Sequence, residues 1–154
     1  MSRVLLITAD KPLPLCDKQE ERTTVIEFPV AAPLAEKLGG SFTVTTLDGF
    51  KVDEHIYYRA AVDELGYSMK PYQYELQLQA CETDVNHLRD YLTANFAPGE
   101  EAELLNLWVG TNHEAGPARF KGTLADFDLE SLEQFLNPPM NAPLVGQCRM
   151  TITI

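Results

Sequence analysis

The chain has 154 residues, of which 45% are hydrophobic and 23% are charged, and its formal net charge is −11. A chain of this length and composition buries a core of its own, so it is expected to form a single domain, 1–154, without disulfide or metal staples. The acidic charge argues against a nucleic-acid partner, because a negative surface repels phosphate groups.

The first 70 residues are predicted to form a mixed α/β portion. Val4 to Thr8 is typical of a buried strand, and Pro12 and Pro14 beyond it cannot continue a central strand. Alternating apolar residues and turn signals define the other elements. These are strands at 24–28 and 41–47, an exposed loop at 15–23, and helices at 33–38 and 53–65.

From Tyr72 to Ile154 the chain alternates in the order strand, helix, strand, strand, helix, strand. Residues 72–80 alternate apolar and polar side chains, as a half-buried strand does. The later elements are expected at 83–96, 104–109, 118–125, 128–136 and 148–154. This order indicates an α+β fold, with a ferredoxin-like (βαββαβ) antiparallel sheet in residues 72–154 and the N-terminal α/β portion packed on it.

Such a sheet carries both helices on one face and leaves the other face open. The alternation directs Leu76, Leu107 and Ile152 toward the helices, and Gln77 and Trp108 toward the open face. Three occupants of that face are considered: residues 1–70, a second copy in a homodimer, or a ligand. Burial of Trp108 by residues 1–70 is the favoured interpretation.

Catalytic candidates are few and isolated. His113 and Glu114 are adjacent at the tip of an expected hairpin, where functional groups are often found. Cys16 in the exposed loop is a candidate nucleophile, and Tyr58 belongs to a tyrosine-rich stretch that also supplies Tyr57. Plain structural roles are the favoured interpretation of the hairpin-tip pair and of the cysteine, because no nucleophile and base are spaced as catalysis requires.

The sequence contains no phosphate loop, zinc spacing or nucleophile elbow, so no metal and no cofactor is expected. The three cysteines, Cys16, Cys81 and Cys148, form no disulfide pattern, which suits a reducing, cytoplasmic setting. No apolar stretch approaches the roughly 20 residues of a membrane span, so no membrane partner is expected.

These observations favour a noncatalytic binding or regulatory module that acts on a protein partner or a small ligand. The alternative is a small enzyme whose site lies between the two halves of the chain. Residues 71–154 hold 12 acidic and 4 basic residues, so a macromolecular partner is expected to be a basic protein. The helical residues Asp84, Asp90, Glu130 and Glu133 are expected to attract it. Trp108, Gln77 and Tyr57 are the candidate binding residues.

Overall fold

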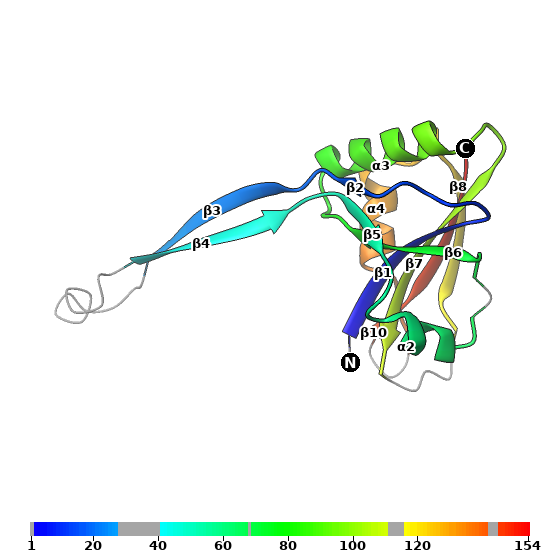
Figure 1. The fold of residues 1–154 in the computed structure, drawn as a ribbon, viewed down its shortest axis with the longest axis horizontal. Coiled ribbons are helices and arrows are strands. Elements are labelled where there is room, and N and C mark those ends of the chain that lie inside the picture. Colours follow the sequence, from blue (N-terminus) through cyan, green and yellow to red (C-terminus); the bar gives the residue numbers. More distant parts are fainter. Residues whose placement is uncertain (1, 28–40, 68, 111–115, 142–144) are drawn as a thin grey trace.

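The computed structural model describes residues 2–27, 41–67, 69–110, 116–141 and 145–154, which form a body and a projecting arm (Figure 1). The body is built on a seven-stranded sheet in the order β2-β5-β6-β1-β7-β11-β8. Every neighbouring pair is antiparallel except β8 and β11. The strands of this sheet are β1 (Ser2–Ala9), β2 (Cys16–Asp17), β5 (Lys51–Glu54), β6 (Tyr72–Gln77), β7 (Glu101–Val109), β8 (Ala118–Thr123) and β11 (Cys148–Thr153).

The arm is a separate two-stranded sheet of β3 (Glu20–Glu27) and β4 (Ser41–Asp48). A third, minor pair joins β9 (Met140–Asn141) to β10 (Val145–Gly146). The helices among the described residues are α2 (Arg59–Glu64), α3 (Glu82–Asn95) and α4 (Leu129–Leu136). The fold is therefore mixed α/β with a mostly antiparallel sheet, and none of these helices is long and apolar enough to cross a membrane.

The ferredoxin-like arrangement is not confirmed. The sheet has seven strands, and β1 occupies the centre between β6 and β7, with Leu6 opposite both Glu75 and Leu105. The strands expected to form the antiparallel set are thus interrupted by the N-terminal strand. In addition, β8 and β11, the two strands that α4 connects, are parallel neighbours, whereas the prediction was of an antiparallel sheet.

The larger core lies between the sheet and helices α3 and α4. Helix α3 buries the apolar stripe that its sequence predicts, including Leu88 and Leu92, and α4 buries Leu132 and Phe135. Alternate residues of the strands meet them, among them Leu76 from β6 and Ile152 from β11. The prediction that both helices share one face of the sheet is correct for α3 and α4.

The predicted side-chain directions in β7 are reversed. Leu105, Leu107 and Val109 pack on the α2 face, whereas Leu104 belongs to the core beneath α3 and α4. Asn106, expected on the open face, instead donates from Nδ2 to the carbonyl oxygen of Phe135 in α4 at 2.9 Å. Alternation misleads here because β7 is covered on both faces, so buried leucines lie on both of them.

The second face of the sheet is covered in part by residues 58–67, which contain α2, and by Met69. Val62 is fully buried against Val4, Leu6 and Leu107. Beyond this small core lies a buried polar group in which Glu103 accepts hydrogen bonds from Thr8 and Arg149 at 2.9 and 2.6 Å. Residues of the first 70 thus cover this face, as the favoured interpretation expected, although Trp108 is not among the side chains that they cover.

Helix α4 begins with a capping box at Asp128. Its Oδ1 accepts a hydrogen bond from the backbone N–H of Ser131 at 2.9 Å, and Ser131 Oγ accepts in return from the Asp128 N–H at 3.3 Å. The hydrogen bonds from Ser131 hold the pKa of Asp128 below its ordinary value of 3.8. The ionised carboxylate is therefore the form that stabilises the helix.

This cap predicts a pH dependence of stability. Because the pKa is lower in the folded state, the contribution of Asp128 is complete above the ordinary pKa and is lost as the pH falls through the folded value. Asp128→Asn retains an acceptor at the cap but cannot titrate. Measured against pH, its free energy of unfolding should fall less steeply in acid than that of the wild type. Equal slopes would contradict the prediction.

Candidate functional site

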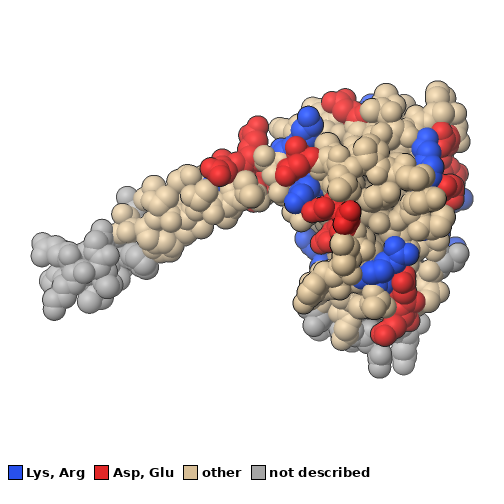
Figure 2. All heavy atoms as spheres, in the orientation of Figure 1, with Lys and Arg blue, Asp and Glu red and all other residues tan. Residues whose placement is uncertain are grey.

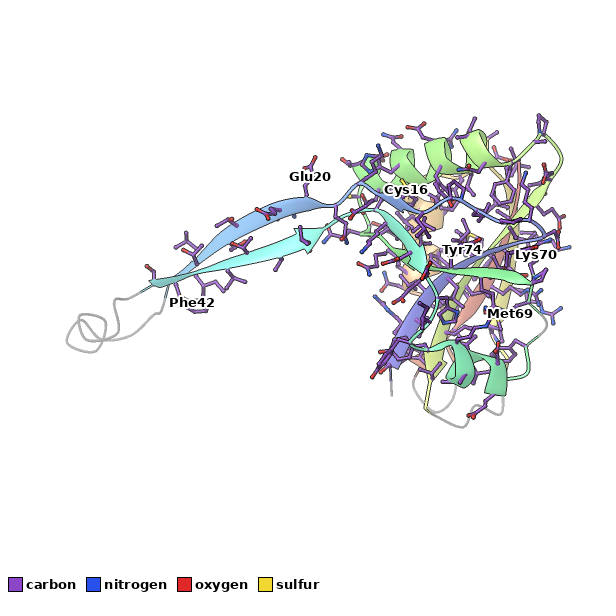
Figure 3. The ribbon with its side chains drawn as sticks, in the orientation of Figure 1. Cys16, Glu20, Phe42, Met69, Lys70 and Tyr74 are labelled. Carbon is purple, nitrogen blue, oxygen red and sulfur yellow. The ribbon has the colours of Figure 1, made fainter. Side chains whose placement is uncertain are left out.

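The arm is the feature that most clearly sets this molecule apart from a plain globule. Strands β3 and β4 pair antiparallel from Glu20 opposite Asp48 to Glu27 opposite Ser41. They project away from the body, with Glu20 at the base and Phe42 near the far end (Figure 3). The described residues outside the arm contribute no third strand to it.

Both faces of the arm expose apolar side chains. Val25 and Leu47 lie on one face and are 61% and 62% exposed, and Ile26 and Val44 lie on the other. An isolated two-stranded hairpin is marginally stable in water, and apolar side chains exposed on both of its faces favour a partner. Figure 2 shows acidic and basic side chains together where the arm meets the body, whereas the visible arm beyond them consists mostly of other residues.

The arm continues the edge of the body sheet through a bend. Strand β2 pairs with β5 in the body, and the Lys18 N–H donates to the carbonyl oxygen of Phe50 at 2.9 Å just before the arm begins. Gly49 turns the returning strand with φ +124°, a conformation that other residues rarely adopt. Phe50, which follows it, is fully buried and anchors the base of the arm in the larger core.

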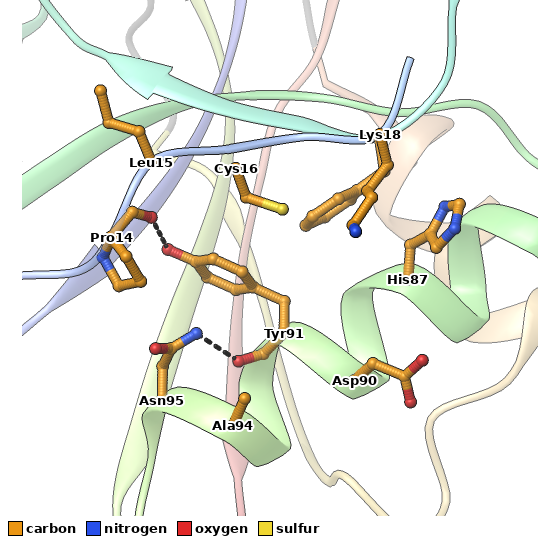
Figure 4. A pocket seen from close by; sticks show the side chains of 10 residues that line it. Pro14, Leu15, Cys16, Lys18, His87, Asp90, Tyr91, Ala94 and Asn95 are labelled. Carbon is orange, nitrogen blue, oxygen red and sulfur yellow. Dashed lines mark hydrogen bonds between the residues drawn. The ribbon is translucent and has the colours of Figure 1, made fainter. Parts of the chain in front are cut away.

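Beside this anchor, a groove of about 530 Å³ runs between the segment 14–18 and helix α3 (Figure 4). The rings of Phe50 and Tyr91 form its apolar wall, with their centroids 5.7 Å apart. Lys18, His87 and Asp90 place titratable groups along it. The volume and the mixture of aromatic and polar lining are those of a site that accepts a small molecule or an inserted side chain.

A hydrogen bond between helix α3 and the segment 14–18 holds the groove in shape. The Tyr91 hydroxyl donates to the carbonyl oxygen of Pro14 at 2.7 Å, and burial raises the pKa of this hydroxyl above its ordinary value. The phenol is therefore neutral and structural. Cys16 lines the same groove (Figure 4) and packs, partly buried, against the larger core.

A second hollow, of about 220 Å³, adjoins the groove at the base of the arm and shares Lys18 and His87 with it. Glu20, Glu21 and Asp48 line it from the arm. Asp84 lies there too, but the expectation that it is an exposed acidic residue of α3 is wrong. It is buried and accepts a hydrogen bond from the Gln79 N–H at 2.6 Å, which joins the start of α3 to the end of β6.

Two of the predicted catalytic residues, Cys16 and Tyr58, lie on opposite faces of the sheet. Cys16 packs on the α3 side of the sheet, whereas Tyr58 packs on the α2 side, with its ring edge-to-face against Tyr57 at 4.7 Å. His113 and Glu114 lie outside the described residues. Cys148 is buried in the core, where desolvation raises the pKa of its thiol to about 12.

The predicted binding residues are also dispersed. Trp108 lies near the end of α4, half-buried, and its indole N–H donates to the carbonyl oxygen of Gly146 at 3.2 Å. Tyr57 is 85% exposed on the opposite face. Gln77 lies next to the arm, because its Oε1 accepts a hydrogen bond from Gln19 Nε2 at 2.9 Å. Of the three, Gln77 is the one placed at the base of the arm.

Within the described ranges, no group of histidine, cysteine and carboxylate side chains is arranged to hold a metal ion. No protein family, curated protein or solved structure matches this chain.

The sequence did not predict the groove, and it predicted a strand over only part of β3. Lys18 and the residues after it were expected in a loop, although β3 begins at Glu20. Tyr91 follows Leu88 by three positions in α3, so helical spacing already placed it beside the buried stripe. The one available signal for the arm was that 20–27 and 41–48 carry apolar residues on both alternating faces, which does not fit a strand with one face on a core.

Proposed function

We propose that the protein is a noncatalytic binding module that binds a protein partner through its arm and the adjoining groove. The observation that carries this proposal is the arm, which exposes Val25, Ile26 and Leu47 to solvent and carries them away from the body. Ordering and exposing these side chains costs free energy in the isolated chain, and burying them against a partner recovers it.

The groove supplies the second contact. Phe50 and Tyr91 wall an apolar hollow beside the base of the arm, where an aromatic or aliphatic side chain of the partner inserts. Buried anchors of this kind dominate the binding free energy of protein interfaces. The rim residues Lys18 and Asp90 then fix the orientation of the partner by polar contacts.

The charge of the chain selects the partner. A net charge of −11 steers basic proteins toward the molecule and repels nucleic acid. Asp90, Glu130 and Glu133 are exposed on α3 and α4 and contribute to this field. The free thiols of Cys16 and Cys81 suit a reducing compartment, so the proposal places the protein in the cytoplasm.

The direct test removes the arm. Glu20 and Asp48 face each other, so replacing residues 21–47 by an Asn-Gly turn closes the body without moving its strands. Affinity capture with the wild type should retain a basic protein that the shortened variant loses, while circular dichroism shows that the body remains folded. Purified, that partner should associate more slowly as salt is raised.

A pair of point variants locates the contact. Val25→Ser with Leu47→Ser removes the apolar side chains from one face and should weaken binding about tenfold or more, as loss of interface anchors does. Thr24→Ser with Thr46→Ser, on the other face, is the matched control and should bind as the wild type does. Retention of the same proteins by the shortened variant would refute the proposal.

A further inference from the structure

We propose that the outer edge of β4, from Thr43 to Leu47, pairs with the same edge of a second copy of the chain. This inference deepens the proposed function by naming what occupies one edge of the arm. The apolar side chains on the faces of the arm stay available to the foreign partner, because edge pairing uses backbone groups.

The edge of β4 differs from the other strand edges of this molecule. Natural sheets protect their edges with charges, proline, bulges or very short strands. Here β2 has only two residues, and the edge strand β8 carries Arg119 and Lys121. Strand β3 carries Glu20, Glu21 and Arg22 and is uncharged only at 23–26, whereas β4 is uncharged from Ser41 to Leu47. Residues 43–47 read Thr-Val-Thr-Thr-Leu, without charge or proline.

Among the described residues, no strand pairs with this outer edge. Its β-branched composition favours an extended, pleated partner rather than a loop. The edge is thus prepared for strand addition, a mode in which main-chain hydrogen bonds supply the affinity.

A two-fold axis through Thr45 gives a self-complementary register. Antiparallel pairing places Thr45 against its copy, Val44 against Thr46, and Thr43 against Leu47. In each pair the two residues point to the same face, because positions of equal parity share a face of β4. No charge meets a like charge, and the result is a four-stranded sheet, which is large enough to be stable where a two-stranded one is marginal.

Charge decides between a second copy and a foreign strand at this edge. The molecule attracts a foreign basic partner through its acidic residues, but residues 43–47 offer such a partner nothing charged. Two copies repel each other through their bodies. The antiparallel register places the bodies at opposite ends of the shared sheet, with the arm bases about 20 Å apart at about 3.4 Å per residue, beyond the Debye length of about 8 Å.

The test uses opposite charges at the axis. The wild-type chain should sediment at twice its monomer mass. Thr45→Lys and Thr45→Glu each place like charges directly opposite each other, and each variant should lose the dimer. An equimolar mixture of the two variants should restore it, because the lysine of one chain then faces the glutamate of the other.

Thr23→Lys is the matched control, because Thr23 faces Thr45 across the arm and is likewise exposed on β3. It should remain dimeric. A monomeric wild type, a dimeric Thr45→Lys variant, a monomeric Thr23→Lys variant, or a mixture that stays monomeric would each overturn the inference. A monomeric wild type that still loses its basic partner on arm removal would leave the proposed function standing, so the two failures are distinguishable.

Discussion

Replacing Arg149 by methionine should destabilise the fold by about 3–5 kcal/mol. Arg149 Nε donates to Glu103 Oε2 at 2.6 Å, and its Nη2 lies 2.6 Å from the same oxygen. The Glu103 side chain is only 3% exposed. Methionine fills much of the space but leaves the carboxylate buried with one remaining side-chain donor, the Thr8 hydroxyl at 2.9 Å.

A second variant separates the lost ion pair from general disruption of the sheet. Glu103→Leu combined with Arg149→Met removes both charges and should recover most of the stability lost by the single variant, because a buried ion pair is often replaceable by apolar residues. Chemical denaturation of the three proteins gives the free energies of unfolding. A loss within about 0.5 kcal/mol for Arg149→Met, the range of an ordinary surface substitution, would show that Glu103 reaches water.

Leu132→Ala should cost about 2–5 kcal/mol of the free energy of unfolding. Leu132 is fully buried in α4, among the side chains of the larger core. Alanine leaves a cavity there that the neighbouring strands cannot close without losing their hydrogen-bonded register. The measurement is the same denaturation experiment.

The control lies one residue along the same helix. Glu133 is exposed, and Glu133→Ala should change the free energy of unfolding by no more than about 0.5 kcal/mol. The contrast between the two positions tests the orientation of α4 rather than its presence. Similar losses at both would mean that the helix is rotated from the position described.

Elements defined by local pattern were predictable from the sequence. The alternation around Leu76 and Ile152 and the stripes of α3 and α4 have one buried face each, so periodicity alone orients them. The predicted direction of the Leu107 side chain is wrong because buried leucines lie on both faces of β7, so the apolar pattern does not distinguish one face from the other. The centre of the sheet was missed because pairing partners distant in sequence leave no local signal.

The candidate site was predictable only in fragments. The strand at 41–47 was expected, but its pairing with 20–27 as a projecting arm depends on Gly49 and Phe50 turning it out of the body sheet. Cys16 and Tyr91 line the same groove because the segment 14–18 packs onto helix α3. Their spacing along the sequence does not reveal this contact. Cys16 was selected as a nucleophile, yet its surroundings are those of a packed side chain.

The central position of β1 governs how this chain folds during synthesis. Leu6 leaves the ribosome well before its two neighbours in the sheet, Glu75 and Leu105, because both follow it at a long distance in the sequence. Until then, the apolar run Val4-Leu5-Leu6-Ile7 has neither of its neighbouring strands to pair with. Such long-range pairing slows folding and lengthens the time for which this aggregation-prone stretch stays exposed during synthesis.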